Sequence, residues 1–171
     1  MDDSEFGDAS GDELKAVGAL LTEPIGRHLR GSPVSVGPET TLAQAVALMQ
    51  QRRIGCVLVV DDEGCLIGIF TERDLLNRVV GHPVDLAVAR IDKYMTANPE
   101  TLAAEDRLAW ALNRMHVGGY RHVPIISEGL VPVGVLSVKD IVDDIVELFP
   151  AEIQNLPPDP SHESPQTDGG A

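Results

Sequence analysis

The apolar residues of this chain change their spacing in a regular order, and that order predicts one structural unit. Between residues 42 and 49 they recur at helical spacing, which indicates an amphipathic helix after a short strand at 34–36. Two continuous apolar runs follow, at Cys56–Val60 and Cys65–Phe70. The acidic, glycine-ended segment Asp61–Gly64 between them is typical of a hairpin turn. Helical spacing then returns, so the predicted order is β-α-β-β-α.

The same pattern occurs twice, at a constant offset of 66 residues. The heptad Gly68–Asp74 is matched by Gly134–Asp140, and no insertion or deletion interrupts the register on either side. A repeat of this length indicates one supersecondary unit written twice, whose copies bury a shared face and form paired clefts. Other residues that keep the offset are Leu42 and Leu108, Ala45 and Ala111, Met49 and Met115, Val57 and Val123, and Leu75 and Ile141.

The second copy is therefore expected to contain the same elements as the first. These are a short strand at Leu102, a helix from Leu108, hairpin strands at Arg121–Ile126 and Val131–Leu136, and a helix from Val138. In the last helix we expect Ile141, Val142 and Ile145 to be buried, and Asp143, Asp144 and Glu147 to face water.

Composition adds the boundaries of the domains. We expect a disordered acidic arm at 1–11, a short helix at 12–23 and the first repeat at 24–81. A connecting helix or linker at 82–97, the second repeat at 98–149 and a disordered Pro-rich tail at 150–171 follow. The formal charge is −14, and most of this acidity lies at the two ends. No basic face that would bind nucleic acid is visible.

The compartment is predicted from what the sequence lacks. No apolar run is long enough to span a bilayer, and the acidic N-terminus does not resemble a signal peptide. Cys56 and Cys65 lie in predicted strands without metal-type spacing and too far apart for a bridge. We therefore expect a cytoplasmic protein with free thiols and no contact with membrane.

The repeated heptad has the pattern Gly-x-x-Ser/Thr-x-x-Asp and allows two interpretations. Ser/Thr-x-x-Asp before an apolar helix can be a capping box that needs no ligand. The same Asp at a helix start can accept from two vicinal sugar hydroxyls, while the Gly lets a ligand approach the backbone. Its occurrence in both copies favours at least one true ligand site, and capping and binding can coexist.

This tandem unit, closing twice in that heptad, resembles the cystathionine β-synthase (CBS) domain pair over roughly residues 24–149. The resemblance implies a mixed α/β (α+β) fold with two β-α-β-β-α repeats packed sheet to sheet in pseudo-two-fold symmetry. It also implies two ligand clefts and frequent homodimers. Members usually bind adenine nucleotides or related adenosyl ligands, regulate another protein, and perform no chemistry of their own.

Carried over residue by residue, the resemblance implies one favoured cleft. Asp140 would hold the ribose, Ser137 and Thr41 would bond sugar or phosphate, Ile54 would flank the base, and Arg121 with His122 would neutralise phosphate.

The second cleft would contain Thr71, Asp74, Arg107 and Tyr120. Gly55 and Cys56 stand there in place of Arg121 and His122, so its strand edge offers no cation and weaker nucleotide binding is expected.

Simpler interpretations of several residues stay open. Arg52 and Arg53 suit a solvated helix end, and His122 could be a structural histidine at a strand edge. Trp110 lies off the apolar stripe of its helix, so it is either an isolated surface aromatic or part of a self-association surface.

The leading functional hypothesis is a regulatory adenine-nucleotide sensor for AMP, ADP or ATP that requires no cofactor and acts on an unknown regulated protein. The alternatives are a sensor of another adenosyl ligand, such as S-adenosylmethionine, and a ligand-independent interaction or dimerisation module. An enzyme is the weakest reading, because the sequence has no phosphate-binding P-loop, dinucleotide fingerprint or Cys/His cluster.

Overall fold

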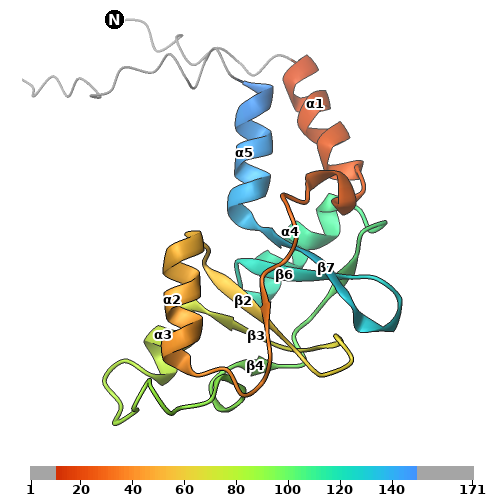
Figure 1. The fold of residues 1–171 in the computed structure, drawn as a ribbon. Coiled ribbons are helices and arrows are strands. Elements are labelled where there is room, and N and C mark those ends of the chain that lie inside the picture. Colours follow the sequence, from red (N-terminus) through yellow and green to blue (C-terminus); the bar gives the residue numbers. More distant parts are fainter. Residues whose placement is uncertain (1–10, 150–171) are drawn as a thin grey trace, which may run out of the picture.

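Each copy folds into a small sheet with a helix before and after its hairpin, in the predicted order β-α-β-β-α (Figure 1). The computed structural model describes residues 11–149. Copy one contains β1 (Ser35–Val36), α2 (Leu42–Arg52), β2 (Cys56–Val60), β3 (Leu66–Thr71) and α3 (Glu72–Arg78). Copy two contains β5 (Leu102–Ala103), α4 (Leu108–Gly118), β6 (His122–Ile126), β7 (Pro132–Ser137) and α5 (Val138–Leu148).

The hairpin of copy one shows how local chemistry sets these elements. The Asp61 carboxylate accepts from the backbone N–H groups of Glu63 and Cys65, at 3.0 and 2.8 Å. Gly64 adopts a φ of +83°, which glycine reaches without steric cost. This turn pairs β2 antiparallel to β3, while β1 runs parallel to β2. Copy two repeats this arrangement with β5, β6 and β7.

The two sheets pack against each other, as the family resemblance implied. A buried cluster of Cys56, Leu58, Leu66 and Ile69 from β2 and β3 lies against Ile126 and Val135 from β6 and β7. Helix stripes close the outer faces. Leu42, Ala45 and Met49 of α2 are buried, and so are their counterparts in α4, Leu108, Ala111 and Met115. Both cysteines are free thiols.

Helix α5 departs from the predicted division between buried and exposed residues. Ile141 is buried, but Val142 is 48% exposed, so its predicted burial was wrong. The Asp144 side chain, expected in water, is only 14% exposed because His28 and Arg30 both bind its carboxylate. The prediction for Asp144 failed because it considered α5 alone, whereas His28 and Arg30, which lie before β1, bind to this helix.

The segment before each copy packs on the other copy. Helix α1 (Gly11–Thr22) and the 3-10 turn η1 (Ile25–His28) pack on α4 and α5 of copy two (Figure 1). Conversely, Ile91, in the linker after copy one, is fully buried in the core of copy one. Ile25 and Ile91 are related by the repeat offset, so each copy is completed by the segment that precedes the other. We call these segments, residues 24–30 and 90–96, the exchanged segments.

The linker is not the helix that was predicted over 82–97. It contains only the 3-10 turn η2 (Ile91–Lys93) and strand β4 (Thr96–Ala97), which pairs antiparallel with β3. The backbone explains the difference. The linker forms backbone hydrogen bonds with the start of α2. The Ile91 N–H donates to the Thr40 carbonyl, and the Leu42 N–H donates to the Ala89 carbonyl. Part of the linker's backbone therefore bonds to copy one, and the bonds within the linker close only short turns.

Some predictions concern other parts of the chain. The expected disordered arm and Pro-rich tail lie outside the described residues, apart from Gly11, which begins α1. Within residues 11–149, no helix has the length and apolarity required to cross a membrane.

Candidate functional site

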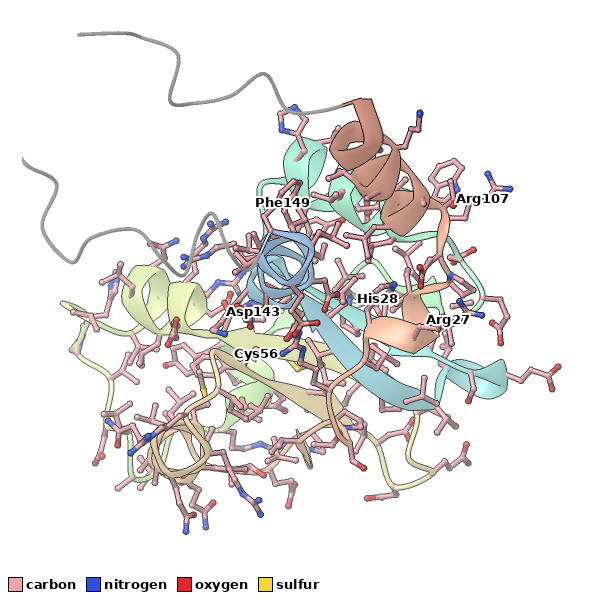
Figure 2. All side chains as sticks on the ribbon, turned by 90° about the horizontal axis from the view of Figure 1, so that it is seen from above. Arg27, His28, Cys56, Arg107, Asp143 and Phe149 are labelled. Carbon is pink, nitrogen blue, oxygen red and sulfur yellow. The ribbon has the colours of Figure 1, made fainter. Side chains whose placement is uncertain are left out.

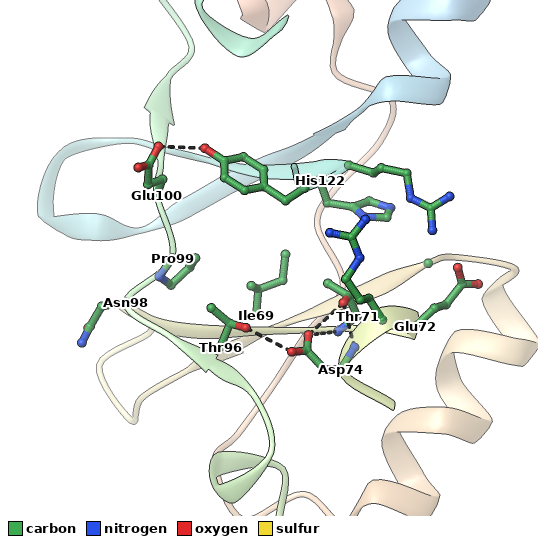
Figure 3. A pocket seen from close by; sticks show the side chains of 13 residues that line it. Ile69, Thr71, Glu72, Asp74, Thr96, Asn98, Pro99, Glu100 and His122 are labelled. Atoms are coloured by element: carbon green, nitrogen blue, oxygen red, sulfur yellow. Dashed lines mark hydrogen bonds between the residues drawn. The ribbon is translucent and has the colours of Figure 1, made fainter. Parts of the chain in front are cut away.

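Two cavities lie between the copies, and the repeat offset relates their walls. The larger, about 640 Å³, is lined by parts of Arg30–Val34, Arg53–Cys56, Arg121–His122 and Ser137–Asp140. The smaller, about 370 Å³, is lined by parts of Thr96–Glu100, Tyr120–His122 and Thr71–Asp74 (Figure 3). Both volumes suit a small ligand. Each heptad therefore faces a cavity that the other copy helps to form.

The heptads form capping boxes at the starts of α3 and α5. The Oδ2 atom of Asp140 accepts from the Ser137 N–H at 2.8 Å and from its hydroxyl at 2.6 Å. Asp74 does the same with Thr71, at 2.9 and 2.8 Å. Capping thus occupies one carboxylate oxygen in each copy and leaves the other, Oδ1, outside the capping box.

The remaining oxygen distinguishes the two carboxylates. Asp74 Oδ1 accepts from the Thr96 hydroxyl at 3.1 Å (Figure 3). It also lies 3.5 Å from the Arg78 guanidinium. Within residues 11–149, Asp140 Oδ1 accepts no hydrogen bond and has only Arg30 Nε at 3.8 Å. The Asp140 side chain is also more exposed, 20% against 10% for Asp74. Asp140 is thus the carboxylate that can still accept from a ligand.

The heptad glycines have a different role from the one predicted. A Cβ on Gly68 would lie 2.2 Å from the sulfur of Met95, and one on Gly134 would lie 2.8 Å from Leu29. Met95 and Leu29 occupy equivalent positions in the two exchanged segments. The missing side chain therefore makes room for those segments rather than for a ligand.

Thr41 and Arg107 do not line either cavity, contrary to their predicted positions. Both are N-cap residues, and the Thr41 hydroxyl accepts from the Gln44 N–H. Isolated bridges pair Thr41 with Arg90 and Arg107 with Pro24. The exchanged segments thus lie across both helix starts, which the sequence pattern did not reveal.

Ile54, Arg121 and His122 line the larger cavity together with Ser137 and Asp140, as predicted. Arg121 and His122 also line the smaller cavity, so this cavity has basic groups although its own strand edge at Gly55 and Cys56 offers none. The cause is their position between the two cavities. A Cβ on Gly55 would lie 3.0 Å from the His122 ring, so glycine lets this imidazole pass across the junction.

Tyr120 lines the smaller cavity, as predicted, but its contacts are structural. Its hydroxyl donates to Glu100 Oε2 at 2.7 Å, and its ring packs against Gly118, where a Cβ would lie 2.1 Å away (Figure 3). Burial and this hydrogen bond raise the pKa of Tyr120 to about 12. Thr71 and Asp74 line the same cavity.

Charge separates the cavities more clearly than size does. The larger cavity has four permanently basic side chains against two carboxylates, and the smaller has two against three. In the larger these are Arg30, Arg53, Arg121 and Lys139 with Glu72 and Asp140; in the smaller, Arg73 and Arg121 with Glu72, Asp74 and Glu100. An anionic ligand is therefore favoured in the larger cavity.

Two of the basic side chains of the larger cavity already form ion pairs with carboxylates. Arg30 binds Asp144 at 2.9 Å, next to the His28–Asp144 hydrogen bond of 2.8 Å, and Lys139 binds Asp143. Figure 2 shows His28 at the side of α5. Arg53 and Arg121 have no ion pair or side-chain hydrogen bond with any residue of 11–149. Arg30 and Lys139 were not predicted as site residues; the repeat offset relates them to Thr96 and Arg73, which line the smaller cavity.

His122 supplies a titratable group beside these arginines. Burial, and secondarily the charge of Arg121, lowers the pKa of His122. The imidazole is therefore neutral at pH 7 and can gain a proton when an anion binds nearby. Within the described part of the chain, no group of His, Cys, Asp and Glu side chains is arranged to hold a metal ion.

Comparison with known proteins gives matches over both repeats. The family model for the CBS domain matches residues 25–81 and 88–147. A 17.7 kDa protein of Acidianus ambivalens is 28% identical over 66% of this chain and 67% of its own length. A CBS domain-containing protein of Arabidopsis thaliana is 30% identical over 66% of this chain, which spans only 20% of that longer protein.

Solved structures show the same fold. A CBS-domain containing protein of Agrobacterium tumefaciens has 30% identity and a TM-score of 0.65, covering 71% of this chain and 98% of its own. A CBS domain protein of Pyrobaculum aerophilum, complexed with AMP, has 24% identity and a TM-score of 0.67, covering 75% of this chain and 100% of its own. The CBS domain pair of protein MJ0100, in complex with 5′-methylthioadenosine and S-adenosyl-L-methionine, has 19% identity and a TM-score of 0.67, covering 74% of this chain and 98% of its own.

Proposed function

Because this chain belongs to the CBS domain family, which matches both of its repeats, we propose that it is a regulatory module that binds an adenine nucleotide in the larger cavity. One observation carries the proposal: Asp140 keeps a carboxylate oxygen without a hydrogen bond among residues 11–149, on the wall of a cavity that also holds an unpaired Arg121. A sugar acceptor and a phosphate partner thus share one site.

The sugar binds at Asp140. Vicinal hydroxyls of a ribose donate to Oδ1, while Oδ2 stays in the capping box with Ser137. The hydrogen bonds are charge-assisted and therefore stronger than those to a neutral acceptor. Arg30, now 3.8 Å from Oδ1, remains held by Asp144 and leaves room for this contact.

The phosphate binds at Arg121 and His122. The β6–β7 register places His122 opposite Ser137, and the Val138 N–H donates to the Arg121 carbonyl at 3.0 Å. These contacts fix both residues next to the start of α5, where the helix dipole also favours an anion. Ile54, which lines the same cavity, offers apolar surface to the base.

The excess of basic side chains bears on the choice among adenosyl ligands. Two solved proteins of this fold hold adenosyl compounds, AMP in one and 5′-methylthioadenosine with S-adenosyl-L-methionine in the other. S-adenosylmethionine carries a sulfonium cation, which the unpaired guanidinium groups of Arg53 and Arg121 would repel. The cavity therefore favours AMP, ADP or ATP.

Calorimetric titration of the whole chain with AMP, ADP, ATP and S-adenosylmethionine tests this function. We expect heat from a nucleotide and a raised melting temperature. Ligand at 100 times its dissociation constant should stabilise the fold by about 2.7 kcal/mol. Folded protein that gives no heat with any of the four would contradict the proposal and favour a ligand-independent interaction module. A response to S-adenosylmethionine alone would refute the nucleotide assignment.

A further inference from the structure

Arg53 occupies a backbone position that normally suits glycine. It follows helix α2 with φ 55° and ψ 45°, in the left-handed region. The residue 66 positions later, Gly119, ends α4 in the same region with φ 67° and ψ 17°. In both copies the backbone N–H of this residue caps its helix. The helix end therefore needs the left-handed conformation but does not need an arginine.

A side chain with a Cβ is strained in this conformation, whereas glycine is not. Arg53 is one of three non-glycine residues with positive φ among residues 11–149. Because Gly119 shows that glycine fits the same helix end, the explanation for Arg53 has to lie in what its side chain does. Observed strain of this kind is a reason to look for function nearby.

The Arg53 side chain lines the larger cavity and not the smaller one. It is exposed, and no residue of 11–149 forms an ion pair or side-chain hydrogen bond with it. The segment that follows it passes directly against His122, because Gly55 lies within contact distance of that ring. Arg53 from copy one and Arg121 from copy two thus present two uncompensated guanidinium groups to one cavity.

Two such groups exceed what a monophosphate needs. Asp140, Arg121 and His122 already provide for the ribose and the first phosphate. Arg53 belongs to the opposite copy and therefore to a different wall. We propose that Arg53 selects for the number of phosphates by binding the outer phosphate of a nucleoside diphosphate or triphosphate. The inference rests on the proposed nucleotide function and narrows it to ADP and ATP over AMP.

The variant Arg53→Gly tests this inference with little risk to folding, because it installs the residue that copy two carries at the equivalent position. Calorimetry with AMP and with ATP, at one pH and ionic strength, gives the two affinities. We expect ATP to bind at least about tenfold more weakly to the variant and AMP to change by less than about twofold. Thermal denaturation without ligand should show a melting temperature equal to or above that of the natural chain.

A matched control is Arg52→Ala. Arg52 is the last residue of α2, carries the same charge one position earlier, and lines neither cavity. It should leave both affinities within about twofold, since only diffuse electrostatics change. Arg53→Lys, which keeps the charge but not the planar fork, should restore part of the ATP affinity.

The outcomes separate this inference from the proposed function. If natural protein binds both nucleotides and Arg53→Gly weakens them equally, or weakens neither, the role of Arg53 in counting phosphates is refuted while the nucleotide site stands. If Arg52→Ala reproduces the selective loss of ATP, Arg53 has no specific role. If natural protein binds neither nucleotide, the proposed function fails, and this inference fails with it.

Discussion

Asp140 and Asp74 show how a single oxygen atom distinguishes two equivalent residues. Both cap a helix through Oδ2, yet Asp74 Oδ1 is bonded by Thr96 and approached by Arg78, while Asp140 Oδ1 faces only Arg30. The difference originates at two positions related by the repeat offset. Thr96 matches Arg30, and Arg78 of α3 matches Asp144 of α5, which holds Arg30. Residues outside both heptads therefore decide which carboxylate is available.

We predict that Asp140→Asn weakens nucleotide binding by roughly 10- to 100-fold, the loss of about 1.5–3 kcal/mol expected for a charge-assisted hydrogen bond. Asparagine retains an oxygen acceptor for the Ser137 N–H and hydroxyl, so the capping box survives. Asp74→Asn is the matched control and should change the affinity by less than about threefold. Calorimetry measures both. A larger loss for Asp74→Asn would place the nucleotide in the smaller cavity instead.

His122 gives a prediction in pH. Burial and Arg121 lower its pKa in the folded chain below the value of about 6.5 expected when unfolded. The folded state then binds fewer protons than the unfolded state in this window. Stability from neutral His122 is present above pH 6.5 and is lost as the pH falls below it. Urea unfolding at pH 7.5 and 5.5 should show a smaller loss of stability for His122→Gln than for the natural chain. An equal or larger loss would mean that His122 is not the group responsible.

The heptad glycine Gly134 provides a test of packing. A Cβ there would lie 2.8 Å from Leu29, so Gly134→Ala overpacks the contact with the exchanged segment. We expect a loss of about 1–3 kcal/mol in the free energy of unfolding, measured in urea. Gly37→Ala is the control, because nothing lies within 4 Å of its built Cβ and its φ is not positive. If both variants were equally stable, the close approach of Leu29 would have no energetic consequence.

At the level of elements, the spacing of apolar residues predicted the helices and strands whose conformation depends on residues close in sequence. The stripe of α2, the apolar run Cys56–Val60 and the acidic turn after it all satisfy their requirements locally, and the repeat supplied copy two. The linker could not be predicted this way, because its conformation is fixed by bonds to Thr40 and Leu42 of copy one. Nothing in the spacing of its own apolar residues encodes that partner.

The same limit explains which site residues were predicted. Ser137, Asp140 and His122 belong to motifs or strand edges that the sequence displays, and the structure brings them to one cavity. Thr41 and Arg107 were misplaced because the exchanged segments cover both helix starts. Arg30 was not predicted because it lies before β1 of copy one yet binds Asp144 on α5 of copy two.

The exchange itself makes a testable prediction about Ile25 and Ile91. Both are fully buried: Ile25, which precedes copy one, lies in the core of copy two, and Ile91, which precedes copy two, lies in the core of copy one. Replacing either with Ala should cost about 2–5 kcal/mol of unfolding free energy, as expected for a buried aliphatic side chain. Val88→Ala, at a linker residue that is 71% exposed, should change it by less than about 0.5 kcal/mol. Chemical denaturation monitors all three. A mild effect of Ile25→Ala would show that the first segment contributes little to copy two.

For the whole molecule, the shared walls are the main consequence of the fold. Gly55, Glu72, Arg121 and His122 line both cavities, so a ligand in either one contacts residues of both copies. Binding should therefore stabilise the two copies against each other rather than one copy alone. Such a module reports ligand through the surface outside its cavities, and the exposed apolar residues show where another chain could contact it.

Helix α4 carries such a surface. Trp110 is 56% exposed and Val117, two helical turns further on, is 77% exposed, so both lie on one outward face. We expect this face to form a homodimer, since a two-fold axis lets one apolar patch cover its own copy and Trp commonly anchors interfaces. Sedimentation equilibrium should show a dimer that dissociates on dilution.

Trp110 is the single tryptophan of the chain, so the tryptophan fluorescence of the protein reports on this surface of α4. If α4 forms the interface, dilution should shift the tryptophan emission to longer wavelength over the concentration range in which sedimentation shows dissociation, because water then reaches the indole. Val117→Gln keeps Trp110 and should weaken the dimer, whereas Val88→Gln, similarly exposed but in the linker, should not. A dimer whose emission does not depend on concentration, and which Val117→Gln leaves intact, would have to form through another face.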